Sequence, residues 1–453
     1  MRIAQVGATD QDGGASAVAM DLHAALAAAG HDTRYFVGTK RQDDAGVELL
    51  LDEDTWPWRL AGYTPATRAL RRAAGRHPNR GFGLAARTLR LLTHPRALAE
   101  RMTGHDSTGW PAATRAISAY EPDIVHAHNL HGGYIDLASL EHLSPRAPVV
   151  VTLHDMWLLT GHCAHAMSCD RWMGGCGECP DLRREPAIAR DATKPNLARK
   201  QRIVMNSRVH AVAPSHWMRA CIERSRLAPH FRSVRVIPNG VDTEVFASDR
   251  RESSRAALGL PADAFIVMLT VGSKGSMWKD DRMLRDTAAI LAARPNPRPV
   301  IFLAVGRHTA VVDRPDVRTI VVDFQADRTR VARYYQAADV YLQASRADTF
   351  PLAVLESLSC GTPVVATNVG GIPEQVCGTS TDAVAAGTMG SATGMLVDRG
   401  DSRSMAEAVA TLMAHEPSRA LMGRNASTAV AERFTLKRQA QAYLQCYQEI
   451  STS

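Results

Sequence analysis

Two carboxylates eight positions apart, Asp348 and Glu356, stand in the segment of this chain with the clearest chemical pattern. Asp348 lies among turn-forming residues, and Glu356 lies one to two turns into an apolar helix that ends near Gly361. The start of a helix presents unpaired N–H groups and the positive end of a dipole, which suits a phosphate. A carboxylate on the next turn suits the hydroxyls of a ribose. We interpret the segment as half of a nucleotide-sugar site; the alternative is a buried helix and strand with incidental acids.

The same segment resembles the motif of two acidic residues separated by seven others in retaining GT-B glycosyltransferases, specifically glycosyltransferase family 4. Both acids are usually Glu in that family, whereas the first is Asp here, and the Gly-Phe-Gly that follows is Thr349-Phe350-Pro351 here. The resemblance implies that Glu356 holds the ribose hydroxyls. It also implies that Asp348 and the backbone N–H groups after it face the donor sugar. The predicted nucleotide-sugar residues of this segment are Asp348, Thr349, Phe350, Pro351, Leu352 and Glu356.

Two lysines follow the first predicted strand of the second half of the chain. Family members usually carry an Arg and, five residues later, Lys-Gly; here Lys274 and Lys279 occupy the two basic positions, and Asp280 replaces the Gly. Two cations at a strand end can neutralise a leaving diphosphate. The alternative is a solvated loop. The resemblance implies a UDP- or GDP-sugar as donor and no requirement for a divalent metal or other cofactor.

A glycine pair, Gly13-Gly14, lies between the first predicted strand and the first predicted helix. Glycines let the backbone approach an anion closely, and a helix start favours negative charge. The spacing is not the dinucleotide fingerprint, and a simple tight turn is the alternative. In the family this loop lies against the donor phosphates, so Gly13 and Gly14 are predicted to contribute to the nucleotide-sugar site.

Histidines end two of the predicted strands in the first half. His126 and His128 alternate along one strand and therefore share a face, and His128 is the better candidate for a position near the reacting sugar. His154 and Asp155 end the next strand and could accept or position the proton of an acceptor hydroxyl. The predicted acceptor-binding residues are His154, Asp155 and His128. The predicted catalytic residues are His128, Asp348 and Lys279.

Four of the eight cysteines, Cys163, Cys169, Cys176 and Cys179, cluster in sequence. In a protein without a secretory signal such a cluster indicates metal binding or reduced thiols rather than disulfides. The spacing is not that of a standard zinc finger, so a structural zinc site and unligated or redox-labile thiols both stay open.

Composition sets the class of protein. The chain has 453 residues, 45% hydrophobic and 22% charged, which indicates a globular protein of two domains. No signal peptide or apolar run of membrane-spanning length is recognisable, which predicts a cytoplasmic protein.

The formal charge of +7 is partly local, because nine arginines and one acid lie in 66–103. This segment predicts either an anionic membrane surface as a partner, which would place the protein peripherally on the inner face of the membrane, or a solvated helix. Sparse aromatic residues argue against nucleic acid.

Apolar runs alternate with helical patterns throughout, which predicts an α/β fold with parallel sheets. By resemblance the fold class is GT-B, with two Rossmann-like doubly wound domains facing a central cleft. The predicted domains are an acceptor-binding domain at 1–247, a nucleotide-sugar-binding domain at 248–435 and a C-terminal helix at 436–453 that packs back on the first. Strands are predicted at Arg2–Gly7, Thr33–Val37, Asp123–His128, Val149–Leu153, Val209–Ala213, Arg235–Pro238, Phe265–Val271, Val300–Val305, Val317–Val322, Val340–Gln343 and Val364–Ala366.

Together these patterns predict a retaining glycosyltransferase that moves a sugar from a nucleotide diphosphate to a hydroxyl-bearing or other nucleophilic acceptor, such as a saccharide, a glycolipid or a natural-product precursor. Two alternatives stay open. A GT-B nucleotide-sugar epimerase or phosphorylase would share the architecture. A peripheral membrane or nucleic-acid binding protein without activity would account for the basic segment. The sequence leaves the donor, the acceptor, the role of segment 40–110 and the oligomeric state undetermined.

Overall fold

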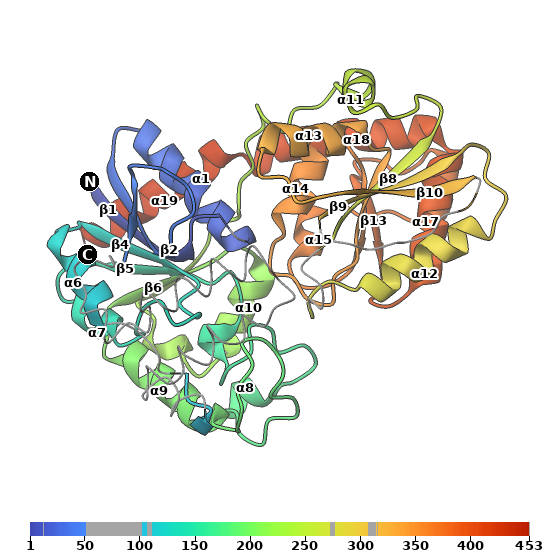
Figure 1. Cartoon of the computed structure of the whole chain (residues 1–453). Helices are drawn as coiled ribbons and strands as arrows, with labels where there is room; N and C mark the ends of the chain where they lie inside the picture. The colour runs from blue at the N-terminus through green and yellow to red at the C-terminus, as the bar shows by residue number, and fades with distance from the viewer. Residues whose placement is uncertain are drawn as a thin grey trace, which may run out of the picture. The chain divides into compact units, whose positions relative to one another are not determined.

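A computed structural model describes residues 1–11, 13–50, 102–106, 111–271, 277–306, 314 and 316–452. By its internal contacts the chain divides into two compact units (Figure 1). Unit 1 comprises Met1–Val212, Ala220–Arg235 and Tyr447–Ser453, and unit 2 comprises Ala213–Arg219 and Val236–Cys446. The predicted domains at 1–247, 248–435 and 436–453 stay a prediction.

Unit 1 is built on a seven-stranded sheet with the order β3-β2-β1-β4-β5-β6-β7. The pairs β1/β2, β2/β3, β1/β4, β4/β5 and β5/β6 are all parallel. Parallel strands are covered on both faces, which explains why β4 and β5 are buried along their whole length. The strands are β1 (Arg2–Thr9), β2 (Asp32–Thr39), β3 (Val47–Leu49), β4 (Ile124–His128), β5 (Val149–Thr152), β6 (Val209–Ala213) and β7 (Ser233–Val236).

Helices connect these strands. They are α1 (Gly14–Ala28), α6 (Pro111–Ala119), α7 (Ser139–Leu143), α8 (Arg171–Gly174), α9 (Thr193–Met205) and α10 (His216–Arg224), with 3₁₀ turns η1 (Trp157–Leu159) and η2 (Ala228–His230). The C-terminal helix α19 (Leu436–Ser451) starts in unit 2 and ends in unit 1. There the hydroxyl of Tyr447 bonds to Nδ1 of His126 at 2.6 Å, and Arg235 pairs with Glu449. These contacts fix the end of α19 on the sheet of unit 1.

Unit 2 is also built on a parallel sheet. It has six strands in the order β10-β9-β8-β11-β12-β13, and all neighbouring strands are parallel. Its strands are β8 (Phe265–Val271), β9 (Val300–Gly306), β10 (Val317–Val322), β11 (Val340–Gln343), β12 (Val364–Thr367) and β13 (Gly394–Val397). Its helices are α11 (Arg251–Leu258), α12 (Asp281–Ala292), α13 (Arg328–Ala337), α14 (Leu352–Ser359), α15 (Ile372–Gln375), α16 (Thr381–Ala386), α17 (Ser402–Ala414) and α18 (Glu416–Arg433).

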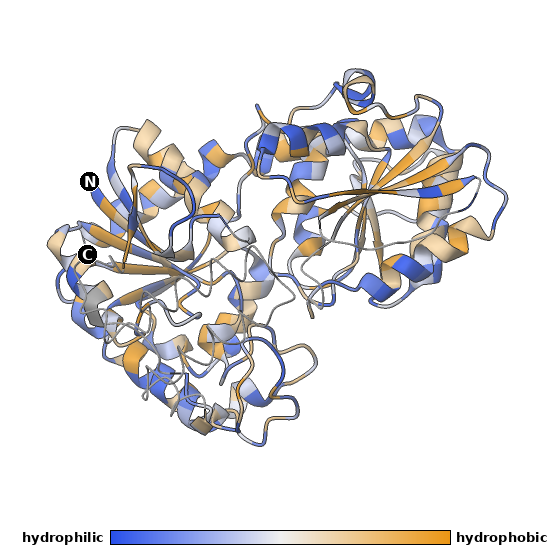
Figure 2. Cartoon of the chain, in the orientation of Figure 1, coloured by the Kyte–Doolittle hydropathy of each residue, from blue (hydrophilic) through white to orange (hydrophobic). Residues whose placement is uncertain are grey.

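The core of unit 2 lies where the sheet meets its helices. Apolar side chains of β8, β9, α12 and α17 form one buried cluster, and the strands stand out as hydrophobic in Figure 2. Several helices begin at an acidic cap. Asp280 accepts the N–H of Met283 at the start of α12, and Asp327 caps α13 in the same way. Such a cap stabilises a helix start by about 1 kcal/mol. This stabilisation accounts for Asp280 at a position where family members usually carry a glycine.

The predicted strands agree with the observed ones to within two residues at each end, and the parallel α/β organisation is confirmed. The predictions missed β3 and β13, which are short strands at the sheet edges. Most of the basic segment 66–103, and with it the predicted membrane contact, lies outside the described residues, as does Lys274. In the ranges that the structure describes, no helix is long and apolar enough to cross a membrane.

Candidate active site

In both units the strand order reverses beside the first strand. Such a reversal point, at the carboxyl ends of parallel strands, is where open α/β sheets bind ligands. In unit 1 the point lies between β1 and β4, and these strands lead into Gly13 and His128. In unit 2 it lies between β8 and β11, which precede Lys279 and Asp348. The topology therefore places most of the predicted site residues at the two reversal points.

The loop from Asp348 to Pro351 in unit 2 is held by its carbonyl groups. The amide of Asn239 donates to Phe350 O at 2.9 Å, and the amide of Gln375 donates to Pro351 O at 3.0 Å. Thr349 and Phe350 are buried. With the carbonyls fixed in this way, the loop enters α14 at Leu352 with extended backbone at Pro351, which is its N-cap.

The glycine pair Gly370-Gly371 packs directly under this loop. The N–H of Gly371 donates to Asp348 O at 3.2 Å. A Cβ at Gly370 would overlap that same oxygen, and a Cβ at Gly371 would overlap Thr349 O. Gly370 also has a positive φ of 57°. Glycine is required at both positions because the two backbones touch.

The start of α14 offers hydrogen-bond donors. Among the described residues, no acceptor pairs with the backbone N–H of Phe350 or of Leu352. The first N–H groups of a helix lack intrahelical partners, and the dipole adds positive potential there. The predicted donor groups at Phe350 and Leu352 are therefore available to an anion or a sugar hydroxyl.

Lys279 is the cation beside this loop. Its ammonium donates to Gln343 Oε1 at 3.0 Å, and its backbone forms a bridge with Ser345. Burial lowers the pKa of Lys279, and the carboxylates of Asp348, Asp281 and Glu356 oppose that shift. The structure thus brings the ammonium and both predicted carboxylates into one electrostatic environment.

The candidate site of unit 2 also contains hydroxyl and amide groups that the sequence analysis did not predict. Tyr341 donates to Gln343 Oε1 at 2.6 Å and shares a 2.6 Å hydrogen bond with Thr270. Burial raises the pKa of the Tyr335 hydroxyl well above its usual value, and the negative charge of Glu356 adds to the shift. One signal in the sequence was available, since Tyr341 and Gln343 alternate along β11 and so share a face.

In unit 1 the predicted glycine loop is exposed. Gly13 has a φ of 89° and forms the N-cap of α1, and its carbonyl accepts the N–H of Ala17 at 3.1 Å. Within the described part of the chain, a Cβ on Gly13 or Gly14 would meet no atom within 4 Å. The space around the glycines is consistent with close approach of a phosphate, and their role stays a prediction.

Three histidines of unit 1, His126, His128 and His154, form a stack. The rings of His126 and His128 are 4.1 Å apart, which confirms that the two share a face, and the ring of His154 stacks on His128 at 5.2 Å. His128 is buried, and its Nδ1 lies 2.9 Å from His154 Nε2. Burial lowers the pKa of His154 to about 4 and that of His128 well below its usual value. All three rings are therefore neutral near pH 7.

The side-chain amide of Gln5 fixes the proton positions in this stack. Oriented so that its nitrogen donates to His128 Nε2 at 3.2 Å, it also donates to Ala19 O and accepts the N–H of His23. His128 must then donate from Nδ1 to His154 Nε2. Neutral His154 carries its proton on Nδ1 and presents a donor rather than a free base.

Asp155 does not pair with His154. Its Oδ2 lies 2.8 Å from Nε2 of His131, and its Oδ1 accepts the N–H of Trp157 at 2.8 Å. Burial alone would raise the pKa of the Asp155 carboxyl. The charge of His131 and the hydrogen bond from His131 outweigh burial and leave the pKa of Asp155 below its usual value. For His131 the same carboxylate overcomes burial and raises the pKa. The His131–Asp155 pair was missed because the two residues are 24 positions apart.

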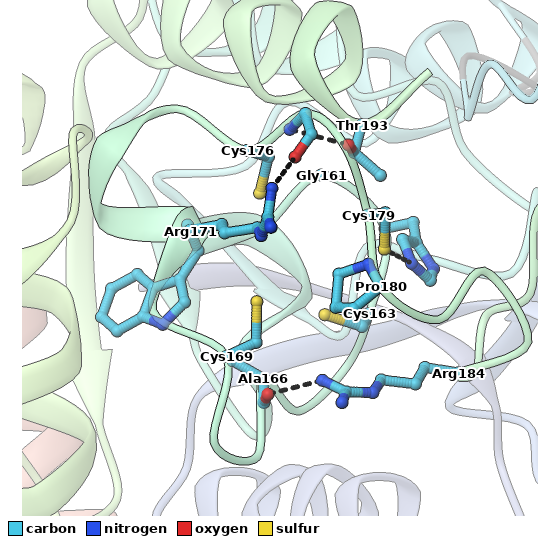
Figure 3. A pocket seen from close by; sticks show the side chains of 13 residues that line it. Gly161, Cys163, Ala166, Cys169, Arg171, Cys176, Cys179, Pro180, Arg184 and Thr193 are labelled. Carbon is cyan, nitrogen blue, oxygen red and sulfur yellow. Dashed lines mark hydrogen bonds between the residues drawn. The ribbon is translucent and has the colours of Figure 1, made fainter. Parts of the chain in front are cut away.

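The four clustered cysteines line one pocket, together with His162 (Figure 3). Over the described ranges, however, no three His, Cys, Asp or Glu side chains are arranged to hold a metal ion. His162 is already engaged on both ring nitrogens, by Pro186 O and by Cys179 Sγ. The structure therefore does not support the predicted zinc site at Cys163, Cys169, Cys176 and Cys179.

Two family models match the chain. The model described as Glycosyl transferases group 1 matches residues 266–415, and the model described as Glycosyltransferase Family 4 matches residues 12–245. The chain belongs to glycosyltransferase family 4. The family predicted from the two-acid motif is thus confirmed. The group 1 match covers that motif, and most of the Family 4 match lies in unit 1.

Similar proteins agree with this membership. The D-inositol 3-phosphate glycosyltransferase of Saccharomonospora viridis is 34% identical over 230 residues, which cover 48% of this chain and 50% of that protein. The aligned part of this family 4 chain thus spans about half the length of that relative. The putative colanic acid biosynthesis glycosyl transferase WcaC of Escherichia coli is 24% identical over 388 residues, covering 81% and 83% of the two chains.

Solved structures show the fold. HepE of Anabaena, crystallised with UDP and glucose, matches with a TM-score of 0.60 and 17% identity over 99% of each chain. At that identity the likeness shows fold alone. The fold of this family 4 member is GT-B, as the sequence predicted, with two Rossmann-like doubly wound units.

Proposed function

We propose that the protein is a retaining glycosyltransferase that moves a sugar from a UDP- or GDP-sugar to an acceptor hydroxyl, such as that of a saccharide. The observation that carries the proposal is the grouping of Asp348, Glu356 and Lys279 at the reversal point of unit 2. Two carboxylates, one ammonium and the start of helix α14 match the parts of a nucleotide sugar. HepE, which shares the fold, was crystallised with UDP and glucose.

Each group has a distinct task in the proposed donor site. Glu356, half-buried on α14, accepts hydrogen bonds from the ribose hydroxyls. Asp348 and the N–H groups of Phe350 and Leu352 contact the donor sugar. Lys279 lies beside the diphosphate and neutralises the charge that grows as the sugar leaves. Its cation supplies the stabilisation that a divalent metal gives in other enzymes, so we propose that no metal is needed.

Further residues of each unit keep their proposed roles. Gly13, Gly14 and Lys274 are proposed to assist at the diphosphate. In unit 1 the His154 Nδ1–H and the buried His128 behind it are proposed to position the acceptor. Asp155, held by His131, fixes the loop that follows His154.

In the proposed reaction the bond between the anomeric carbon and the phosphate oxygen breaks while a bond to the acceptor oxygen forms on the same face. The acceptor hydroxyl loses its proton to the leaving phosphate oxygen. This assignment agrees with the stack of histidines, because a neutral His154 bonded at Nε2 to His128 is not free to act as the base. Configuration at the anomeric carbon is retained.

The test is a screen of UDP- and GDP-sugars with saccharide acceptors, read by NMR of the product's anomeric proton. The expected product keeps the configuration of the donor, forms in the presence of a chelator, and is absent with Glu356→Ala. Asp286→Asn, which removes an exposed carboxylate on α12, is the matched control and keeps wild-type activity. A product of inverted configuration, or full activity in Glu356→Ala, would sink the proposal.

A further inference from the structure

The pocket in unit 1 gathers four of the chain's eight cysteines, and the proposed function uses none of them. Cys163, Cys169, Cys176 and Cys179 are free thiols, and each is partly exposed. Figure 3 shows their side chains placed around the same space. Four thiols within one pocket can exchange disulfide bonds with one another and with small reagents.

The turn that carries Cys176 and leads into Cys179 has a constrained backbone. Four consecutive residues, Gly175–Glu178, have positive φ values of 121°, 57°, 99° and 48°, and two of the four are not glycine. This conformation is uncommon for residues with a side chain. N–H groups of the turn and of Cys179 hold it, donating to Arg171 O, Thr193 Oγ1 and Asp191 Oδ2 at 2.7 to 2.9 Å. The turn therefore fixes the backbone of Cys176 at the pocket, and the hydrogen bond to Asp191 fixes that of Cys179.

His162 is placed as a base for one thiol. Its Nδ1 lies 3.0 Å from Pro186 O, and a carbonyl only accepts, so Nδ1 carries the proton and donates. Burial lowers the pKa of His162, which keeps the ring neutral. Nε2 then has a free lone pair, and it lies 3.4 Å from Cys179 Sγ. The thiol of Cys179 therefore donates to an imidazole whose tautomer is fixed.

The charges around Cys179 explain why it needs such a base. Burial raises its pKa, and Asp191 and Cys169 raise it further, against Arg184 and the N–H of Asp181. Burial also raises the pKa of Cys163, and raises that of Cys176 to about 11. These thiols are protonated at neutral pH, and protonated thiols react slowly. Among the four pocket thiols, the contact with His162 distinguishes Cys179.

We propose that Cys179 is a reactive thiol for low-molecular-weight disulfides, and that a second thiol of the same pocket converts the adduct to an internal disulfide. The Cys179 sulfur, deprotonated by His162, attacks one sulfur of the reagent. The reagent's S–S bond breaks and the first thiol leaves with the proton. Cys163, Cys169 or Cys176 then attacks the Cys179 sulfur and releases the second reagent thiol. Two protein thiols lose two electrons in total, and one reagent disulfide becomes two thiols.

The test treats the full chain with oxidised glutathione at pH 7.5 and maps the products by mass spectrometry of peptides without reduction. Cys377 is the internal reference, because it is exposed, lies in unit 2 and is not part of the pocket. The expected result is a glutathione adduct at Cys377 and an internal disulfide at Cys179. His162→Gln keeps a donor for Pro186 O but removes the base. It should slow the Cys179 reaction by about tenfold or more and leave the rate at Cys377 unchanged.

Three kinds of result would overturn the proposal. The first is a stable glutathione adduct at Cys179 with no internal disulfide. The second is an unreacted Cys179 under conditions that modify Cys377, or a rate at Cys179 that His162→Gln does not change. The third is one equivalent of zinc in the protein purified without added metal, because the thiols would then be ligands. The proposal does not depend on the glycosyltransferase assignment, and neither does its readout.

Discussion

Replacing Gly370 with Ala tests whether the Asp348 loop depends on the contact beneath it. Gly370 and Gly390 have the same φ of 57°, so alanine at either position meets the same backbone strain. They differ in surroundings, because a Cβ at Gly370 would overlap Asp348 O, whereas a Cβ at Gly390 would meet no atom of the described residues within 4 Å. Gly390→Ala is therefore a matched control for strain without a clash.

The expected loss of stability has two contributions, backbone strain at positive φ and steric overlap of the new Cβ. The left-handed conformation costs an alanine about 1–2 kcal/mol, and both variants should lose that much stability. Forcing an extra carbon against a packed backbone adds about 1–3 kcal/mol for Gly370→Ala alone. In a unit of this size each kcal/mol lowers the Tm by about 2–4 °C.

Scanning calorimetry of the wild type and the two variants measures the difference. Gly370→Ala should melt below Gly390→Ala by at least about 2 °C, and it should also bind a nucleotide more weakly because the Asp348 carbonyl has to move. Equal melting temperatures for the two variants would refute the claim that the glycine pair supports the loop through direct contact.

Three further predictions concern single side chains. Because burial lowers the pKa of folded His154 to about 4 from 6.5, the unfolded state takes up the proton first, and stability is lost as pH falls below about 6.5. Between pH 7 and pH 5 urea titrations should show the wild type losing about 2 kcal/mol more than His154→Gln; parallel profiles would contradict this. Tyr447→Phe, which removes the hydroxyl bonded to His126 Nδ1, should lower the free energy of unfolding by about 1–2 kcal/mol, and an unchanged value would count against the bond. Lys279→Met should weaken binding of UDP or GDP by about tenfold or more at an unchanged Tm, and unaltered affinity would remove Lys279 from the donor site.

Local sequence signals were sufficient for the strands of both sheets except β3 and β13. Continuous apolar runs marked the buried strands, because parallel strands are covered on both faces. The helix from Leu352 and the turn before it were visible in the order of polar, proline and apolar residues. Asp348 and Glu356 could be predicted as a pair because only one loop and one turn of helix separate them.

Contacts between distant residues could not be predicted in this way. Gln5 reaches His128 across 123 positions, and Tyr447 reaches His126 across 321, since the register of β1 on β4 and the end of α19 decide these pairs. Likewise, the short spacing of the four cysteines predicted a cluster, but it did not predict how their side chains are arranged. The orientation of His162, set by Pro186 O, could not be read from cysteine spacing.

Calorimetric titration of the wild type and Glu356→Gln with UDP and with GDP tests the central claim most directly. Glutamine keeps the shape of the side chain and removes the charge that accepts the ribose hydroxyls. One of the two nucleotides should bind the wild type with one site per chain. The variant should bind it at least about tenfold more weakly, because a hydrogen bond to a charged group contributes about 1.5–3 kcal/mol. Failure of both nucleotides to bind, or equal affinity in wild type and variant, would contradict the assignment of unit 2 as the donor site.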